Sequence, residues 1–243
     1  MENIFDSWLV CQPIAHRGLH DKEIPENSLP AFENAINNGY AIELDVQMIA
    51  DGTLVVFHDE SLSRVTNNDG YLKFLNKSDL EILTLKGSKE KIPTFEETLK
   101  FINGRTPILI EIKNKSKVGD LEKKVIELLK DYKGEYAVES FNPYVLQYFE
   151  KHAPNILRGQ LAGYLKKEKL PFFQKFALKR MLLNKHISKP NFIAYEAKVL
   201  PNRFVRKFKN LPLIAWTVKS QNEYLKVVKY CDNVIFEDFE PKI

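Results

Sequence analysis

Apolar runs of strand length alternate with helical patterns along almost the whole chain, and this alternation is the feature that most restricts the fold. Strands are expected at residues 9–15, 41–46, 107–112, 136–140, 156–161, 192–195, 213–218 and 233–236. Because strands that alternate with helices form βαβ units, the pattern predicts a parallel sheet. Eight such units in 243 residues favour an α/β fold of the TIM (β/α)₈ barrel type. A doubly wound open sheet is the alternative, but no glycine-rich dinucleotide-binding loop follows the first strand.

The chain is expected to form a single domain over residues 1–243, with one insertion and an incomplete last unit. Residues 47–93 are largely polar and contain the turn sequence Asn67-Asn68-Asp69-Gly70. We therefore expect a small, loop-rich insertion after the second strand. The sequence reaches Ile243 a few residues after the last strand. We expect the eighth helix to be missing or reduced, with residues 5–9 covering the gap.

Three acidic residues stand on two of the expected strands. Side chains two apart on a strand share a face, so Glu43 and Asp45 point the same way. Two carboxylates held together raise their own pKa values, and a bound cation relieves this repulsion. Glu111 belongs to the next barrel strand, and the carboxyl ends of barrel strands form one face. Three carboxylates from neighbouring strands make an oxygen-only site, which suits Mg²⁺ or Ca²⁺ rather than Zn²⁺.

Two histidines and two basic side chains accompany these acids. His16 and Arg17 follow the first expected strand, His58 ends an extra β-rich run, and Lys113 lies two residues after Glu111. Arg17 and Lys113 add positive charge beside the expected metal, which favours an anion with several oxygens such as phosphate. His16 and His58 can supply a base and an acid near neutral pH. Together these groups predict a metal-assisted displacement at a phosphodiester.

An ordered series of short motifs resembles the glycerophosphodiester phosphodiesterase family. The series covers nearly the whole chain, and the part within residues 15–66 is the most specific. Its members are His16-Arg17-Gly18, Pro25-Glu26-Asn27-Ser28, Ala31-Phe32, Glu43-Leu44-Asp45-Val46, Asp51-Gly52, His58-Asp59, Leu62-Ser63-Arg64, Glu111-Ile112-Lys113 and Trp216-Thr217-Val218. The resemblance implies a TIM barrel of the phospholipase-C-like phosphodiesterase type.

The resemblance also implies a reaction and a set of site residues. The reaction is hydrolysis of a glycerophosphodiester to an alcohol and sn-glycerol 3-phosphate, with a bound divalent cation, Mg²⁺ or Ca²⁺. The residues implied are the acid/base pair His16 and His58, the phosphate contacts Arg17 and Lys113, the substrate wall Trp216, and the metal ligands Glu43, Asp45 and Glu111. Neither the motifs nor the residue types decide which histidine is the acid and which is the base.

Two other functions stay open at this point. One is a phosphodiesterase of the lysophospholipase D type, or one that removes phospholipid headgroups, acting at a membrane. The other is a barrel that binds phosphodiesters without hydrolysing them. An acid/base pair of histidines argues against the second, because a binding module has no need of one.

Positive charge is concentrated in residues 165–209, which contain 13 Lys or Arg and 2 Asp or Glu for a net charge of +11 in a chain of +4. Within this segment, residues 171–183 combine Phe172, Phe173 and Phe176 with interspersed lysines. Two interpretations are open: a barrel helix with its apolar side inward, or an amphipathic helix in peripheral contact with an anionic membrane. No nucleic-acid-binding motif accompanies the charge, so no nucleic-acid partner is expected.

The cysteines and the hydropathy bear on location. Cys11 and Cys231 are the only cysteines, and two widely spaced cysteines are typical of reduced thiols rather than of a disulfide framework. The N-terminal residues lack the basic and apolar regions of a secretory signal. These features favour a cytoplasmic protein, with any membrane contact at the inner surface. They do not predict an oligomeric state.

Overall fold

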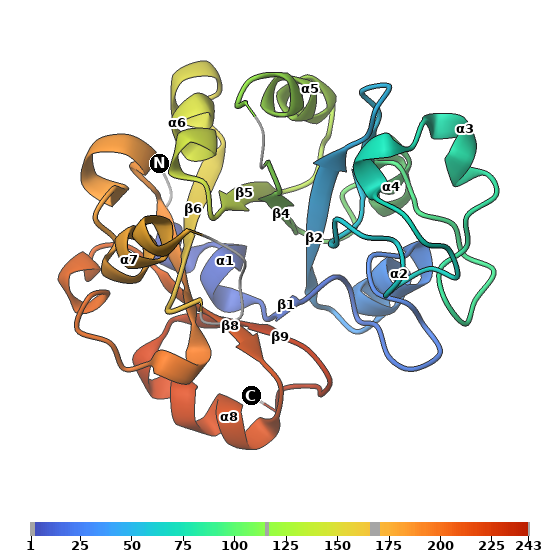
Figure 1. Ribbon diagram of the computed structural model, residues 1–243. Coiled ribbons are helices and arrows are strands. Elements are labelled where there is room, and N and C mark those ends of the chain that lie inside the picture. The colour runs from blue at the N-terminus through green and yellow to red at the C-terminus, as the bar shows by residue number, and fades with distance from the viewer. Residues whose placement is uncertain (1–2, 115–116, 166–170, 243) are drawn as a thin grey trace. The chain divides into compact units, whose positions relative to one another are not determined.

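The computed structural model describes residues 3–114, 117–165 and 171–242 (Figure 1). These residues fall into two compact units, one of Ala15–Tyr136 and the other of Met1–Ile14 with Ala137–Ile243. The expectation of one domain over residues 1–243 stays a prediction. Among the described residues, no helix has both the length and the apolar character that a bilayer span requires.

The Ala15–Tyr136 unit is built on the long strand β2 (Ala41–Met48), which pairs in parallel with β4 (Ile108–Ile112) and antiparallel with β3 (Leu54–Val56). Its helices are α2 (Leu29–Asn37), α3 (Lys77–Leu80), α4 (Phe95–Ile102) and α5 (Asp120–Leu129), with a 3₁₀ turn, η2 (Leu72–Phe74). Helix α2 packs against β2, and α4 packs against β3. The strands therefore hold the centre of this unit and the helices cover them (Figure 1).

The second unit contains a parallel run of five strands, each paired with the next one along the chain from β5 to β9. These strands are β5 (Tyr136–Ser140), β6 (Leu157–Ala162), β7 (Phe192–Glu196), β8 (Leu213–Val218) and β9 (Asn233–Phe236). The helices are α1 (Trp8–Cys11), α6 (Pro143–His152), α7 (Phe172–Arg180) and α8 (Gln221–Val227). Short 3₁₀ or π-helical turns are η1 (Ile4–Asp6), η3 (Asn184–Ser188), η4 (Ala197–Val199), η5 (Arg206–Phe208) and η6 (Val228–Tyr230).

The order of the strands decides between the two predicted sheet types. Parallel strands follow one another in chain order and alternate with helices, as in a TIM (β/α)₈ barrel. A doubly wound sheet would reverse its strand order at a switch point, and no such reversal occurs among the described strands. The TIM-barrel prediction is confirmed, and the doubly wound alternative is wrong.

Helices α2 and α4 of the Ala15–Tyr136 unit begin at side-chain caps. Ser28 Oγ accepts the backbone N–H of Ala31 at 3.3 Å, and Thr94 Oγ1 accepts that of Glu97 at 3.2 Å. Glu97 in turn accepts the backbone N–H of Thr94, which completes a capping box. Ser28 and Thr94 are therefore the N-caps of α2 and α4.

The prediction of a first strand over residues 9–15 is wrong for most of its length. Residues Trp8–Cys11 are helical, and the strand β1 is limited to Ile14–Ala15. Trp8 and Leu9 are buried on one side of this helical turn. A short apolar run does not distinguish a buried strand from a buried helical turn, which is why the pattern misled. Residues 202–208 contain a 3₁₀ turn, η5, rather than an α-helix.

Residues 47–93 form a packed insertion rather than a loose excursion. They contain β3, η2 and α3. Ten of their buried side chains form one hydrophobic cluster: Ile49, Val55, Phe57, Leu62, Val65, Leu72, Leu80, Leu83, Leu85 and Ile92. Phe57 belongs to this cluster, so the backbone that leads into His58 is fixed by packing.

The last strand is covered by the N-terminal segment. Residues 237–242 contain no helix, in agreement with the expected absence of an eighth helix. Asn233 of β9 donates from Nδ2 to the carbonyl oxygens of Leu9 and Gln12 at 2.8 and 2.7 Å. These bonds attach α1 and the residue after it to the start of β9, which is where residues 5–9 were expected to lie.

Gly18 is a position where a side chain is costly, and we expect Gly18→Ala to destabilise the fold by about 1–3 kcal/mol. Its φ is +80°, and a Cβ there would lie 2.9 Å from the backbone of Ala31 in α2. The control is Gly39→Ala, with φ +72° and nothing within 4 Å of the added Cβ, which carries the conformational cost alone. Urea unfolding should show a larger loss for Gly18→Ala than for Gly39→Ala. Equal losses would contradict the proposed close packing at Gly18.

Candidate active site

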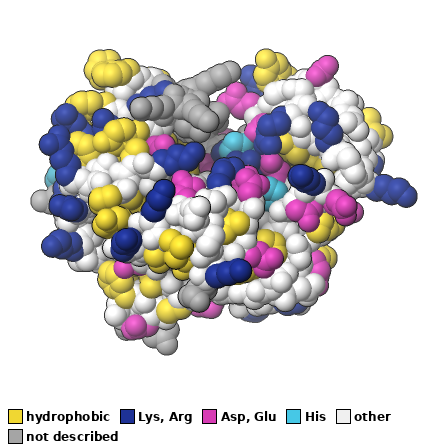
Figure 2. All heavy atoms as spheres, turned by 90° about the horizontal axis from the view of Figure 1, so that it is seen from below, with side chains coloured by type: hydrophobic (Ala, Val, Ile, Leu, Met, Phe, Trp, Pro, Cys, Tyr) yellow, Lys and Arg dark blue, Asp and Glu magenta, His cyan; other side chains and the backbone are white. Residues whose placement is uncertain are grey.

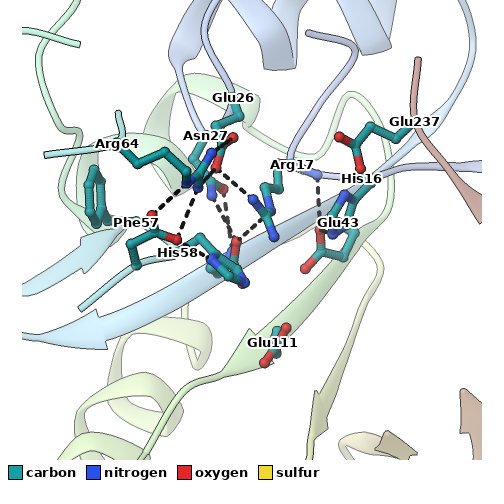
Figure 3. A network of polar contacts seen from close by, with 12 residues as sticks. His16, Arg17, Glu26, Asn27, Glu43, Phe57, His58, Arg64, Glu111 and Glu237 are labelled. Carbon is teal, nitrogen blue, oxygen red and sulfur yellow. Dashed lines mark hydrogen bonds and ion pairs between the residues drawn. The ribbon is translucent and has the colours of Figure 1, made fainter. Parts of the chain in front are cut away.

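The three predicted metal ligands lie together in the Ala15–Tyr136 unit. The parallel register of β2 and β4 places Asp45 beside Glu111, and Glu43 shares the face of Asp45 two residues earlier. All three are buried, and one carboxylate oxygen from each lies within 4.8 Å of the others. Figure 3 shows Glu43 on β2 and Glu111 on β4 turned toward the same space. Strand alternation and the neighbouring position of the two strands therefore predicted correctly that these three side chains lie together.

The cluster has the chemistry of a site for a hard divalent cation. It consists of carboxylate oxygens, which Mg²⁺ and Ca²⁺ prefer. Asp45 Oδ1 is buried and accepts no hydrogen bond from any residue that the structure describes. Burial, together with the negative charge of Asp45, raises the pKa of Glu111. A cation bound among these oxygens would satisfy Asp45 Oδ1 and remove the repulsion between the carboxylates.

Arg17 and Lys113 contact the acidic cluster directly. Lys113 Nζ lies 3.1 Å from Glu111 Oε1 and 3.3 Å from Asp45 Oδ1, and Arg17 Nε lies 3.3 Å from Asp45 Oδ2. The prediction that Asp45 has a raised pKa is wrong. Burial alone would raise the pKa of Asp45, but electrostatic interaction with Lys113, followed by His58 and Arg17, lowers it well below its usual range.

The two predicted histidines also belong to this unit. His16 follows β1, and its Nε2 lies 4.0 Å from Glu43 Oε2. His58 follows β3, and its Nδ1 lies 2.6 Å from Asp59 Oδ1. This contact fixes the orientation of the His58 ring. Because Nδ1 is engaged by Asp59, Nε2 is the atom through which His58 can exchange a proton with a substrate.

A chain of ion pairs links His58 back to Arg17 through residues whose roles sequence reasoning missed. Arg64 binds both carboxylate oxygens of Asp59 and both of Glu26. Glu26 Oε1 also lies 2.7 Å from Arg17 Nη1. Figure 3 shows this series of contacts between the loop that carries Arg17 and the loop that carries His58. Glu26 and Arg64 stand within the recognised motifs, and that was the only signal in the sequence.

Hydrogen bonds to β2 also hold these two loops, through Asn27 in the first loop and through Gln47 of β2 in the case of the second. Asn27 donates from Nδ2 to Asp45 Oδ2 at 2.8 Å and so attaches the loop that carries it to β2. Gln47 donates from Nε2 to the carbonyl oxygens of Phe57, His58 and Asp59. The loop carrying His58 is thereby fixed at three successive carbonyl groups.

Trp216 lies in the second unit, on β8. Its ring packs edge to face on Phe141, with ring centroids 5.4 Å apart. Its indole N–H is buried and donates to no residue that the structure describes. A buried, unpaired donor next to an aromatic surface is compatible with a wall that contacts a polar ligand. The role of Trp216 as a substrate wall stays a prediction.

Replacing Glu26 with glutamine is expected to destabilise the protein by about 3 kcal/mol at neutral pH. Burial alone would raise the pKa of Glu26, but Arg64 and Arg17 lower it from 4.5 to about 2. A lowered folded-state pKa contributes stability that is complete above the unfolded value of 4.5 and is lost as the pH falls toward 2. Glu26→Gln should therefore remove most of the acid-dependent loss of stability between these values.

The control for this prediction is Glu33→Gln. Glu33 pairs with Arg105 at 2.8 Å, but both side chains are exposed, and exposed pairs contribute little. Chemical denaturation measured over a pH series should show a flattened acid limb for Glu26→Gln and an unchanged one for Glu33→Gln. The Glu26 pairing would be of no energetic consequence if the two variants behaved alike.

The fold and the acidic cluster together define a TIM-barrel protein with a site that fits a divalent cation. The chain belongs to the glycerophosphoryl diester phosphodiesterase family, whose sequence profile matches residues 16–239. A glycerophosphodiester phosphodiesterase of Caldanaerobacter subterraneus is 39% identical over 160 residues, which cover 61% of this chain and 65% of that protein. The protein YhdW of Bacillus subtilis is 30% identical over 229 residues, which cover 88% of each chain.

Solved structures agree with this assignment. An Oleispira antarctica phosphodiesterase in complex with the product sn-glycerol-3-phosphate has a TM-score of 0.80 and 24% identity, with 94% of this chain and 93% of that one covered. A glycerophosphodiester phosphodiesterase from Thermotoga maritima has a TM-score of 0.71 and 26% identity, with 92% of each chain covered. The fold predicted from the sequence is therefore that of known members of the family.

Proposed function

We propose that this protein hydrolyses glycerophosphodiesters to an alcohol and sn-glycerol 3-phosphate in a reaction that depends on a divalent cation. One observation carries the proposal. Three buried carboxylates, two basic side chains and two histidines are gathered in a single compact unit of a chain from the glycerophosphoryl diester phosphodiesterase family. Sn-glycerol 3-phosphate is also the product bound to the structurally similar Oleispira antarctica enzyme.

Glu43, Asp45 and Glu111 are proposed to hold the cation, with Mg²⁺ and Ca²⁺ both suited to their oxygens. When bound, such an ion would polarise a phosphoryl oxygen and stabilise the charge that develops there. The charge balance of the site supports this role. The three carboxylates with Arg17 and Lys113 carry a net charge of −1, which repels a phosphodiester, whereas a divalent ion changes it to +1, which attracts one.

Arg17 and Lys113 are proposed to contact the phosphate. Both are fixed by carboxylates of the cluster, and the burial of Lys113 is offset by Glu111 and Asp45, which raise its pKa. Both side chains are therefore cationic over the whole physiological range. Each presents further N–H donors to an anion, and Arg17 can do so in the forked geometry that suits phosphate oxygens.

His16 and His58 are proposed to act as the acid/base pair. His58 is held by Asp59 through Nδ1, which leaves Nε2 for the substrate, and its side chain is 31% exposed. His16 lies 4.0 Å from Glu43, next to the proposed cation. One imidazole accepts the proton of the attacking oxygen, and the other donates a proton to the departing alcohol.

Two oxygens are candidates for the attack on phosphorus, a glycerol hydroxyl of the substrate and the oxygen of water. A free glycerol hydroxyl of the substrate can displace the alcohol to give a cyclic glycerol phosphate, which water then opens. Direct attack by water gives glycerol phosphate in one step. A quenched time course separates the two routes, because a transient cyclic phosphate occurs in the first and is absent from the second.

The test of the proposed function is coupled detection of sn-glycerol 3-phosphate from glycerophosphocholine and glycerophosphoethanolamine. Activity should disappear on treatment with a chelator and return when Mg²⁺ or Ca²⁺ is added in excess. Glu33→Gln, at an exposed position outside the cluster, serves as a matched variant that should keep full activity. Binding of glycerophosphocholine without any release of glycerol phosphate would favour the non-catalytic alternative.

A second candidate activity is the cleavage of lysophospholipids at the same site. The observation in its favour is the exposed aromatic helix α7, with Phe172 and Phe173 at 74% and 81% exposure, since an enzyme acting on lipids gains from membrane contact. Comparison of lysophosphatidylcholine with glycerophosphocholine as substrates decides between the two.

A cytoplasmic location is proposed because the two cysteines form no disulfide. Cys11 and Cys231 are both free thiols, as expected for a protein in a reducing compartment. The proposed partner is a small glycerophosphodiester, and no nucleic acid is expected.

A further inference from the structure

Helix α7 presents aromatic side chains to solvent instead of to the core. Phe172, Phe173 and Phe176 are 74%, 81% and 38% exposed. Among the nine residues of this helix, all of them described, Leu178 alone is buried. Of the two interpretations of this segment, the one with its apolar side turned inward holds for Leu178 and is wrong for the three phenylalanines. Three exposed phenylalanines on one short helix need a partner to cover them.

The three rings form one continuous apolar group. Residues 172 and 176 are separated by one helical turn, so they share a face. The ring of Phe172 lies 5.8 Å from that of Phe173 and 6.3 Å from that of Phe176, measured between centroids. This exposed group is large enough to insert into another apolar phase as a unit, which scattered exposed residues cannot do.

Basic side chains frame these rings. The guanidinium of Arg180 lies 4.2 Å from the centroid of the Phe176 ring, and Lys207 Nζ lies 3.5 Å from the carbonyl oxygen of Arg180. Arg203 stacks on Phe204, which also lies next to Arg180. Neither residues 171–183 nor residues 197–209 contain an acidic side chain. Figure 2 shows Lys and Arg side chains interspersed with hydrophobic ones at its left side.

We propose that the surface formed by Phe172, Phe173, Phe176, Arg180, Arg203 and Lys207, here called the α7 surface, docks on the anionic headgroups of a lipid bilayer. An interfacial helix inserts aromatic side chains at the boundary of headgroups and acyl chains, while Lys and Arg remain at the level of the headgroups. Each basic residue near an anionic surface strengthens binding by about fivefold. The α7 surface carries both elements on neighbouring segments of one unit.

A second copy of the chain is a poorer occupant of the same surface. A two-fold symmetric interface brings the same residues of both subunits together. Arg180, Arg203 and Lys207 would then face their own copies, with no acidic side chain from residues 171–183 or 197–209 to neutralise them. Anionic lipid supplies that neutralisation and covers the phenylalanines at the same time. The proposal does not rest on the phosphodiesterase activity, since binding is measured without substrate.

The experiment is co-sedimentation of the full chain with vesicles of phosphatidylglycerol or of phosphatidylcholine, at low and high salt. We expect binding to phosphatidylglycerol vesicles, weakened by salt, and little binding to phosphatidylcholine vesicles. The double variant Phe172→Ser with Phe173→Ser should lose at least about tenfold in the partition coefficient. Arg180→Gln with Arg203→Gln should lose about 25-fold. Both pairs are exposed, so folding should be unaffected.

The matched control is Phe74→Ser with Ile82→Ser, because these side chains are 67% and 79% exposed and lie on the insertion. This variant should bind vesicles as the unchanged chain does. Lack of binding to phosphatidylglycerol, equal binding to both lipids, or unchanged binding of the Phe172/Phe173 variant would overturn the proposal. A dimer that forms without lipid and is lost in that variant, measured by sedimentation velocity, would identify a second copy as the occupant and overturn it as well.

Discussion

Replacing His58 with alanine is expected to lower kcat for glycerophosphodiester hydrolysis by about 10²–10⁴-fold, the usual contribution of a positioned acid or base. The imidazole is held by Asp59 at 2.6 Å, and Asp59 is held by Arg64. The ring therefore has one orientation, and its Nε2 can transfer a proton without the cost of finding that orientation. Removal of the ring leaves the acidic cluster intact, so KM should change much less than kcat.

The control for His58→Ala is His152→Ala. His152 lies at the end of α6 and is exposed, and its ring stacks on Tyr148, so its loss removes an imidazole that is no part of the cluster. Steady-state kinetics with glycerophosphocholine should show full activity for this variant. A value of kcat for His58→Ala within tenfold of that for His152→Ala would exclude a proton-transfer role for His58.

The acidic cluster could be predicted from the sequence because it depends on the regular geometry of strands. Glu43 and Asp45 share a face by alternation alone. The parallel pairing of β2 with β4 then brings Glu111 beside Asp45. Neither step requires a loop conformation. The same reasoning gave the wrong direction for the pKa of Asp45, because it counted the repulsion between the carboxylates and left out the effect of Lys113, His58 and Arg17 on Asp45.

The network behind His58 could not be predicted, because it depends on loops. Glu26 and Arg64 are 38 residues apart in the chain and meet through side chains alone. The first of these loops contains Arg17 and Asn27 with φ of 57° and 54°, a left-handed conformation that non-glycine residues seldom adopt. No propensity or periodicity indicates such a conformation. The two loops are instead held by their contacts with Asp45 and Asp59.

Which side chains of α7 face the core could not be predicted from the sequence either. The spacing of Phe172, Phe173 and Phe176 shows that they share a face but does not show whether that face points inward. The structure gives the inward position to Leu178, while Met181 after the helix joins the buried cluster with Tyr195 and Val205. The core there is filled without the phenylalanines, which explains why they remain outside.

Replacing Asp45 with asparagine is expected to abolish both the response to divalent cations and the activity. Asparagine has nearly the same shape, and its amide oxygen can still accept the hydrogen bond from Asn27. The substitution therefore removes a charge with little loss of volume. In the unchanged chain, a cation at 100 times its Kd adds about 2.7 kcal/mol to the free energy of unfolding, because it binds the folded state alone. Asp45→Asn should lose most of this increase.

Thermal unfolding with and without Mg²⁺ or Ca²⁺ measures this response independently of catalysis. The Tm of the unchanged chain should rise with cation concentration and fall again with a chelator, whereas that of Asp45→Asn should rise by only a small part of this increase. Asp131→Asn, which removes an exposed carboxylate of the same unit, should respond as the unchanged chain does. The activity of Asp45→Asn should fall by at least about 100-fold. The substitution removes one of the three negative charges of the cluster, so the site no longer favours a cation. If Asp45→Asn kept the full cation-dependent rise in Tm, the ion would bind elsewhere. Glu43, Asp45 and Glu111 would then be buried acids that Lys113 and Arg17 alone neutralise.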